Sequence, residues 1–241
     1  GYDISAIRTP YDNTFAHLVR KHLTDKKELT PGLYEGWGGI ALTFLEAMRA
    51  GVIPPDEVNI SMIGRAFENV SEFLDLGGGV AGQGAALLQC MDVLGAEVIK
   101  PLLDHYVNIL LEAQQSDGAW FGAPGSPYEK IKHPGLAVGT GGIVIFLIAF
   151  NARFPGERVG AAIKKALNWM ISQATRVKDV YTWKLSKEPT LAERYSRDMG
   201  VPGIALAFIY AYVQLKDPTY KEVAVGTLLG INEQPVLVDF S

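Results

Sequence analysis

Four stretches of the chain share one order of glycine and apolar positions. Each has a turn of the form G-x-x-G, followed by an apolar run long enough for a helix. The turns recur at intervals of roughly 40 to 60 residues, which is typical of a repeated supersecondary unit. Their first glycines are Gly36, Gly79, Gly139 and Gly200.

Between these turns lie segments of a second kind. Their apolar residues recur at positions i, i+3, i+4 and i+7, with polar residues on the remaining positions, so each predicts a helix that buries one face. The predicted helices cover residues 13–23, 62–74, 98–114 and 158–174. The helices that follow the glycine turns are apolar nearly all round and should be buried on both sides.

Alternating half-buried and fully buried helices predict two concentric helical layers. The fold class is therefore all-α, an α/α toroid with glycine-rich turns at the N-termini of the inner helices, where tight turns or close backbone approach are needed. No strand is required, although residues 178–185 are compatible with a short hairpin. In such a toroid the four turns surround one mouth. Their backbone N–H groups and helix dipoles should favour anionic or polar groups there.

Composition narrows the function classes. The chain has 241 residues, 48% hydrophobic and 20% charged, with a net charge of -4, which gives no reason to expect a nucleic-acid partner. The single cysteine, Cys90, excludes an internal disulfide and is expected to be a buried thiol in the second inner helix. The longest apolar run, residues 142–150, is far shorter than the ~18 residues of a membrane span. Without a secretory signal, the expected location is cytoplasmic.

The glycine turns resemble a known family. "GLYEGWGGIAL", "GLAVGTGGI" and "MGVPGIAL" are similar, in order, to motifs of the lanthionine synthetase C-like family, the cyclases that close thioether rings in ribosomal peptides. The resemblance covers residues 33–212 and implies a toroid that acts on a precursor peptide. Complete family toroids are longer than this chain, which begins at Gly1 and ends in the apolar stretch "EQPVLVDFS". We therefore expect residues 1–241 to form one domain of a longer chain, with an incomplete toroid.

The resemblance also implies a chemistry. Active members hold zinc with two cysteines and a histidine, so that the metal lowers the pKa of a substrate thiol, which then adds to a dehydroamino acid. Here Asp198 stands at the position of the first zinc cysteine, Val138 at that of a histidine before the third turn, and Met199 at that of an aromatic residue. We therefore expect no zinc and no other cofactor. This favours the zinc-less type, whose cyclase domain is fused to kinase and lyase domains.

Candidate site residues follow from the same resemblance. Asp75 and Arg194 match an acidic and a basic position that face the family's cavity; the alternatives are a helix cap for Asp75 and a surface ion pair for Arg194. The predicted catalytic residues are Asp75, Arg194 and Asp198, and the predicted substrate contacts are Trp37, Trp120, His133 and Met199. His133 is also compatible with a purely structural place in a loop. The other histidines, His17, His22 and His105, are expected on outer helices.

Other functions stay open at this point. "AQQSDGAWFG", residues 113–122, resembles the Q-x-x-x-G-x-W motif of squalene and related terpene cyclases, but their catalytic D-x-D-D is absent, so the motif supports only the fold. Carbohydrate-active enzymes with this fold use paired acids. Candidates for such a site are Glu35, Asp75, Asp117 and Asp198, with Trp37, Trp120 and Trp183 as sugar-stacking faces. A non-catalytic peptide-binding toroid is the third alternative, so the sequence leaves catalysis itself uncertain.

Overall fold

Within the described part of the chain, four helices form the inner layer, and each begins directly after the first glycine of a G-x-x-G turn. The computed structural model describes residues 13–14, 17, 29–34, 36–185 and 194–232. The inner helices are α2 (Trp37–Arg49), α4 (Val80–Gln89), α7 (Thr140–Arg153) and α10 (Val201–Leu215). Their N-caps are Gly36, Gly79, Gly139 and Gly200, so glycine-rich turns lie at the N-termini of the inner helices, as predicted.

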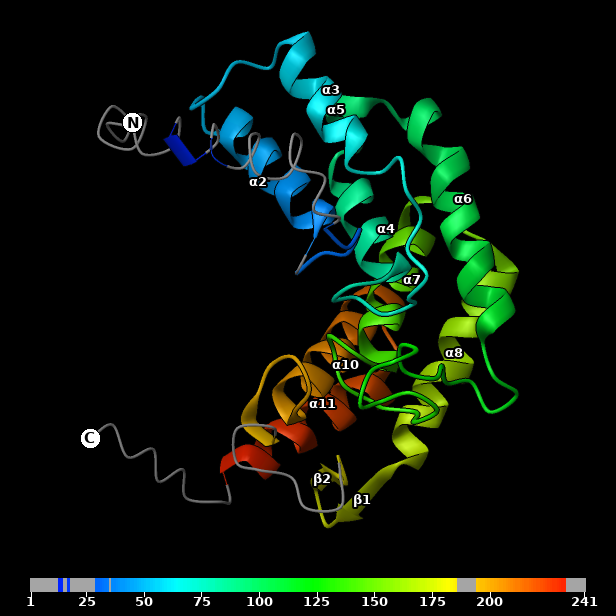
Figure 1. The fold of residues 1–241 in the computed structure, drawn as a ribbon. Helices are drawn as coiled ribbons and strands as arrows, with labels where there is room; N and C mark the ends of the chain where they lie inside the picture. The colour runs from blue at the N-terminus through cyan, green and yellow to red at the C-terminus, as the bar shows by residue number, and fades with distance from the viewer. Residues whose placement is uncertain (1–12, 15–16, 18–28, 35, 186–193, 233–241) are drawn as a thin grey trace, which may run out of the picture.

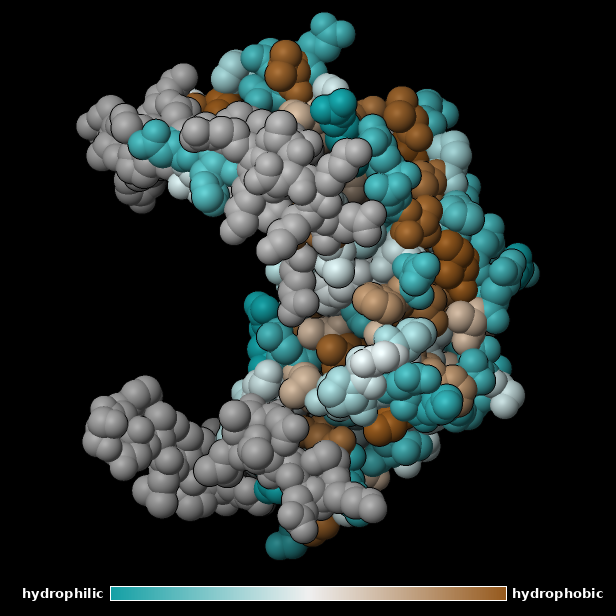
Figure 2. Space-filling model, in the orientation of Figure 1, coloured by the Kyte–Doolittle hydropathy of each residue, from teal (hydrophilic) through white to brown (hydrophobic). Residues whose placement is uncertain are grey.

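A second layer covers the inner helices from outside. Figure 1 shows the described helices along an arc, with α6 and α8 on its convex side and α4 and α7 further in. The outer elements are α3 (Glu57–Arg65), α5 (Met91–Leu94), α6 (Ala96–Ala113) and α8 (Glu157–Ser172). The space-filling view shows the concave side of the arc as an open hollow (Figure 2). The predicted double-layered, all-α architecture is therefore confirmed, and the core lies between the layers.

The predicted helices differ in outcome. The helices predicted at 98–114 and 158–174 are present as α6 and α8. Most of the helix predicted at 13–23 lies outside the described residues, and so does the C-terminal stretch 233–241. The helix at 62–74 was wrong, because α3 ends at Arg65 and a loop follows. The buried Gln83 side chain accepts a hydrogen bond from Ser71 N–H at 2.9 Å and donates to the Asn69 carbonyl at 2.6 Å. These contacts satisfy the loop backbone without a helix.

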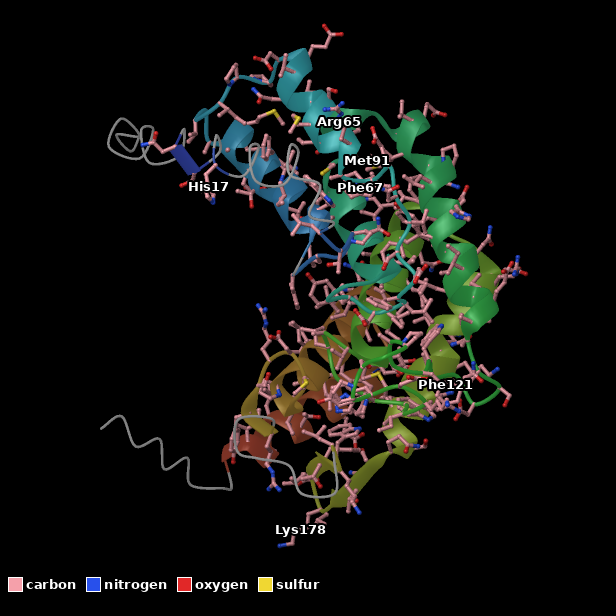
Figure 3. All side chains as sticks on the ribbon, viewed as in Figure 1. His17, Arg65, Phe67, Met91, Phe121 and Lys178 are labelled. Carbon is pink, nitrogen blue, oxygen red and sulfur yellow. The ribbon has the colours of Figure 1, made fainter. Side chains whose placement is uncertain are left out.

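A short hairpin follows α8 directly. Strand β1 (Ala174–Val177) pairs antiparallel with β2 (Val180–Trp183), and Lys178 lies at the tip of the hairpin with a positive φ of 54° (Figure 3). The sequence indicated a hairpin at 178–185 and so located only the second strand.

The last described helix, α11 (Pro218–Asn232), was not predicted. It packs against α10 and β2. Gly226 and Gly230, one helical turn apart, face the hairpin, and a side chain at Gly226 would overlap the carbonyl of Asp179. The absence of side chains at these two glycines lets β2 lie close to α11.

The segment with the Q-x-x-x-G-x-W pattern joins two outer helices. The Gln114 amide donates to the Gly118 carbonyl at 2.9 Å and to the Ala162 carbonyl, on α8, at 3.0 Å. The Trp120 indole N–H donates to the Leu110 carbonyl at 2.7 Å. The motif thus ties the end of α6 to α8 and contributes to the fold. Among the described helices, none combines the length and apolar character that a membrane crossing would need.

Candidate functional site

The turns before α2, α4, α7 and α10, called here the first to fourth turns, share a close backbone contact. In each, the second glycine of G-x-x-G packs against the carbonyl of the residue six positions earlier, so closely that a Cβ atom would overlap it. The pairs are Gly39 with Leu33, Gly82 with Leu76, Gly142 with Leu136, and Gly203 with Arg197. The motif is therefore required by backbone approach and does not by itself indicate a ligand.

The same turns use the first N–H groups of the inner helices. The first residue of α2, α4 and α7 donates its N–H to the carbonyl of the residue seven positions earlier. These bonds are Trp37 to Thr30 at 2.9 Å, Val80 to Phe73 at 2.9 Å and Thr140 to His133 at 2.8 Å. The expectation that these leading donors would face a ligand in the mouth is therefore wrong, because the turn carbonyls already occupy them.

A chain of backbone hydrogen bonds joins the four turns side by side. It uses the residue two positions before each leading glycine, and we call these four residues the rim: Tyr34, Gly77, Ala137 and Asp198. Tyr34 N–H donates to Gly77 O at 3.0 Å, Gly77 N–H to Ala137 O at 2.8 Å, and Ala137 N–H to Asp198 O at 2.6 Å. The N–H of Asp198 donates within its own turn, to Ser196 Oγ at 3.0 Å. The rim thus fixes the backbone of Asp198 at the mouth.

Three side chains meet at this rim. The guanidinium of Arg197 lies 5.3 Å from the centre of the Tyr34 ring, and its Nε lies 3.2 Å from Asp198 Oδ1. We call Tyr34, Arg197 and Asp198 the rim cluster. Tyr34 is 40% exposed, and the side chains of Arg197 and Asp198 are 64% and 47% exposed, so a ligand in the mouth can reach all three. Burial and the nearby Asp198 carboxylate raise the pKa of Tyr34, which Arg197 opposes.

The sequence placed Asp198 in the site and missed Tyr34. No local signal marks Tyr34, because its partners Arg197 and Asp198 come from the fourth turn and Tyr34 from the first. Only the repeat register, which puts Tyr34 and Asp198 at the same position of their turns, would have paired them.

Met199 and His133 form a second group beside the rim. The Tyr128 hydroxyl donates to Met199 Sδ at 3.0 Å, and the Tyr128 ring packs edge-on against His133 at 5.3 Å. His133 is 3% exposed, and its Nδ1 accepts a hydrogen bond from Gly135 N–H at 2.9 Å. His133 therefore holds the backbone of the third turn from a buried position. Met199 is half-buried.

Asp75 and Arg194 lie in different surroundings. Asp75 is 8% exposed, and its Oδ1 accepts a hydrogen bond from Gly78 N–H at 2.8 Å, so it holds the second turn. Arg194 is half-buried and lines a cavity of about 260 Å³, together with Lys184, Tyr195 and Gly230, beside the hairpin and α11. The structure thus places Asp198 in the rim cluster, Asp75 inside the neighbouring turn and Arg194 in a separate cavity.

The tryptophans also differ in access. Trp120 is buried, with its indole N–H bonded to the Leu110 carbonyl, and the buried Trp183 donates to the Met170 carbonyl at 2.9 Å. A ligand cannot reach Trp120 in this structure, because only 1% of its surface is exposed. Trp37 is half-buried and lines a cavity of about 250 Å³ with Arg65, which Figure 3 labels at the end of α3.

The acidic residues proposed for a carbohydrate-active site are poorly suited to act as an acid–base pair. The carboxylate of Asp117 accepts a hydrogen bond from Lys132 Nζ at 2.7 Å, and this bond lowers its pKa. Lys132 also lies over the ring of Phe121, which is exposed on the same loop (Figure 3). An acid whose charged form is stabilised in this way is a poor proton donor. Asp75 is committed to its turn, and Glu35 lies outside the described residues.

The donor set does not fit zinc. Within the described parts of the chain, no group of three histidine, cysteine or carboxylate side chains is placed to hold a metal ion. Asp198 is paired with Arg197, and Cys90 is buried at the end of α4, where burial raises its thiol pKa to about 12. His22 falls outside the described residues. A tetrahedral site needs thiolate or imidazole ligands close together, and these residues do not supply them.

Comparison with known proteins gives two findings. The sequence model of the family described as "Lanthionine synthetase C-like protein" matches residues 55–224. The solved structure of nisin cyclase is similar with a TM-score of 0.75 at 17% sequence identity, over 99% of this chain and 67% of that one. At this identity the likeness shows the fold, and it confirms the predicted α/α toroid. No curated protein sequence matches significantly.

Proposed function

Because this chain belongs to the lanthionine synthetase C-like family, we propose that it acts as a lanthipeptide cyclase domain on a dehydrated ribosomal peptide. In this reaction the thiol of a peptide cysteine adds to the β-carbon of a dehydroamino acid, and the α-carbon then takes a proton. The product is a thioether ring. The partner is the precursor peptide, and residues 1–241 are one domain of a synthetase that also contains kinase and lyase domains.

The observation that carries this proposal is the rim cluster. The mouth presents a carboxylate, Asp198, held by a guanidinium, Arg197, and the sequence resemblance aligns Asp198 with the family's first metal ligand. A carboxylate with one hydrogen-bonded partner can accept the proton of a thiol that approaches it. We therefore propose that ring closure uses proton transfer and positioning in place of zinc.

The remaining candidate residues have supporting parts in this proposal. Met199 contacts the peptide beside the rim and Trp37 contacts it from the cavity that it shares with Arg65, since both are partly accessible. Asp75 and His133 act as positioning residues, because their polar atoms hold the second and third turns. Arg194 binds a more distant part of the peptide from its separate cavity. The cytoplasmic location expected from the sequence stays a prediction.

A non-catalytic peptide-binding domain is the second candidate. It is favoured by the same ion pair, because a carboxylate already bound to Arg197 also suits a surface that only recognises peptide. The two candidates predict different losses when the site is changed. If the domain only docks the peptide, dehydration is lost; if it is a cyclase, ring formation is lost and dehydration is kept.

The test is a ring-closure assay with the intact synthetase. The unmodified precursor peptide and a nucleoside triphosphate are incubated with the wild-type protein, with Asp198→Asn, or with Asp179→Asn as a control on the hairpin turn, and dehydration is read from the loss of peptide mass. Ring closure does not change the peptide mass, so remaining thiols are counted by alkylation and mass spectrometry. Loss of rings in Asp198→Asn with dehydration intact supports a cyclase. Normal rings in that variant, or loss of dehydration alone, contradicts it.

A further inference from the structure

We propose that Tyr34 is the acid of the ring-closing reaction, giving its hydroxyl proton to the α-carbon after the thiol has added. This inference rests on the proposed function and names a residue to which neither the sequence motifs nor the family match assigns a role. It starts from one juxtaposition: the first and fourth turns are the two ends of the rim, yet Tyr34 and Arg197 lie in contact across the mouth.

The position of Tyr34 is fixed on two sides. Its backbone N–H donates to Gly77 O at 3.0 Å, at the same level of the rim as Asp198. Its ring lies under the guanidinium of Arg197 at 5.3 Å, within the range of a cation–π contact. A phenol held by its backbone and its ring face has little freedom to turn away from the mouth, as an acid in a stereoselective step requires.

Three other described polar groups near the rim already have partners. The Tyr128 hydroxyl is bonded to Met199 Sδ, the Asp75 carboxylate accepts from Gly78 N–H, and His133 Nδ1 accepts from Gly135 N–H. Among the described residues, none forms a hydrogen bond with the Tyr34 hydroxyl. Burial and the Asp198 carboxylate raise the pKa of Tyr34, so its hydroxyl keeps its proton at neutral pH until a strong base, such as an enolate, forms beside it.

The step balances without any co-reactant. Asp198 takes the proton of the substrate thiol as the sulfur–carbon bond forms at the β-carbon. The π electrons of the carbon–carbon double bond move into an amide enolate. Tyr34 then gives its proton to the α-carbon, and solvent at the exposed mouth returns a proton to the phenolate while the carboxylic acid of Asp198 releases one. Arg197 lies between the two groups and stabilises each anion in turn, so the cluster returns to its starting state.

A single fixed acid has a stereochemical consequence. Protonation of the planar enolate creates a new stereocentre, and an acid held on one side of the mouth delivers the proton to one face. Water, which can approach from either side, gives a mixture. The configuration of the α-carbon therefore reports on Tyr34 separately from the rate.

The experiment compares the intact wild-type synthetase with Tyr34→Phe and Tyr210→Phe on a dehydrated precursor peptide. Phe keeps a ring under Arg197 and lacks only the hydroxyl, while Tyr210 is an exposed tyrosine on α10 outside the rim. The readouts are the single-turnover rate of thiol loss, the peptide Kd, the melting temperature, and the configuration of the hydrolysed thioether amino acids by chiral gas chromatography.

We expect Tyr34→Phe to lower the rate about 100-fold, in the range found when a general acid is removed. Kd and melting temperature should stay at wild-type values, the rings that still form should have mixed configuration, and Tyr210→Phe should behave as wild type. Tyr34→Phe rings of one configuration at a rate within twofold of wild type would overturn the assignment to Tyr34 and leave the proposed function standing. A wild-type protein that forms no rings overturns both.

Discussion

The guanidinium of Arg197 lies 5.3 Å from the centre of the Tyr34 ring, although the two residues belong to the fourth and the first glycine turns. Between them, three backbone hydrogen bonds run from Tyr34 through Gly77 and Ala137 to Asp198. The turns therefore form a curved rim whose ends meet through side chains, so the exposed cluster depends on every turn in the series.

Removing the guanidinium should affect the reaction more than the fold. We expect Arg197→Met to slow ring closure about tenfold, equivalent to about 1.4 kcal/mol of barrier, because Asp198 and Tyr34 lose their shared partner. The free energy of unfolding should change by only about 0–1 kcal/mol, as for exposed ion pairs. The control is Arg158→Met on α8, in the outer layer. An equal loss of rate in both variants contradicts a specific role for Arg197.

The second glycine of each turn should tolerate no side chain. In Gly142→Ala the new Cβ would overlap the Leu136 carbonyl and press on the Leu76 side chain, which should cost about 1–3 kcal/mol of unfolding free energy. Gly160→Ala, in the first turn of α8 with open space around the position, should instead stabilise by about 0.5–1 kcal/mol. Urea denaturation measures both. Similar changes in unfolding free energy for the two variants would contradict the claim that the close backbone contact excludes a side chain at Gly142.

Gln83 should be needed for the loop that follows α3. Gln83→Met removes the buried partner of Ser71 N–H and of the Asn69 carbonyl, and each unsatisfied group should cost about 1–3 kcal/mol. Gln89→Met, at an exposed position of the same helix, should stay within about 0.5 kcal/mol of wild type. Denaturant unfolding distinguishes them, and a tolerated Gln83→Met would show that the loop has other means of satisfying its backbone.

Cys90 should be chemically silent in the folded protein. Burial raises its thiol pKa from 9.0 to about 12, so the reactive thiolate is scarce at pH 8 and the side chain is also inaccessible. Iodoacetamide should modify it only after denaturation. Because the folded pKa is the higher one, its contribution to stability is complete below about pH 9 and declines as the pH rises toward about 12. Rapid labelling of the native protein at pH 8 would place the thiol elsewhere.

Ring closure by this domain should not respond to metal removal. The described residues offer no three-ligand group, so prolonged dialysis against a zinc chelator should leave the rate of thiol loss within about twofold of the untreated protein, and added zinc should not increase it. A zinc-dependent member of the family serves as the positive control. Loss of activity that zinc alone restores would contradict proton transfer by Asp198 as the activating step.

The sequence by itself determined which helices form the inner layer. The G-x-x-G turns and the apolar runs behind them are local signals, because a turn glycine and the carbonyl that it contacts are only six residues apart. For that reason a glycine turn at the start of each inner helix was predicted, although each helix begins directly after the first glycine and so includes the rest of the G-x-x-G motif. The outer helices α6 and α8 were predicted nearly as well from their periodic apolar positions.

Only the tertiary structure decided the rest. The segment at 66–74 has a helical pattern but forms a loop, because Gln83, on the next helix, bonds its backbone. His133 and Trp120 had the residue types of a binding site and were found buried, with their polar atoms bonded to nearby backbone groups. The rim cluster joins the first turn to the fourth, and contacts across that distance depend on how four separate helices pack, which no local pattern of residues encodes.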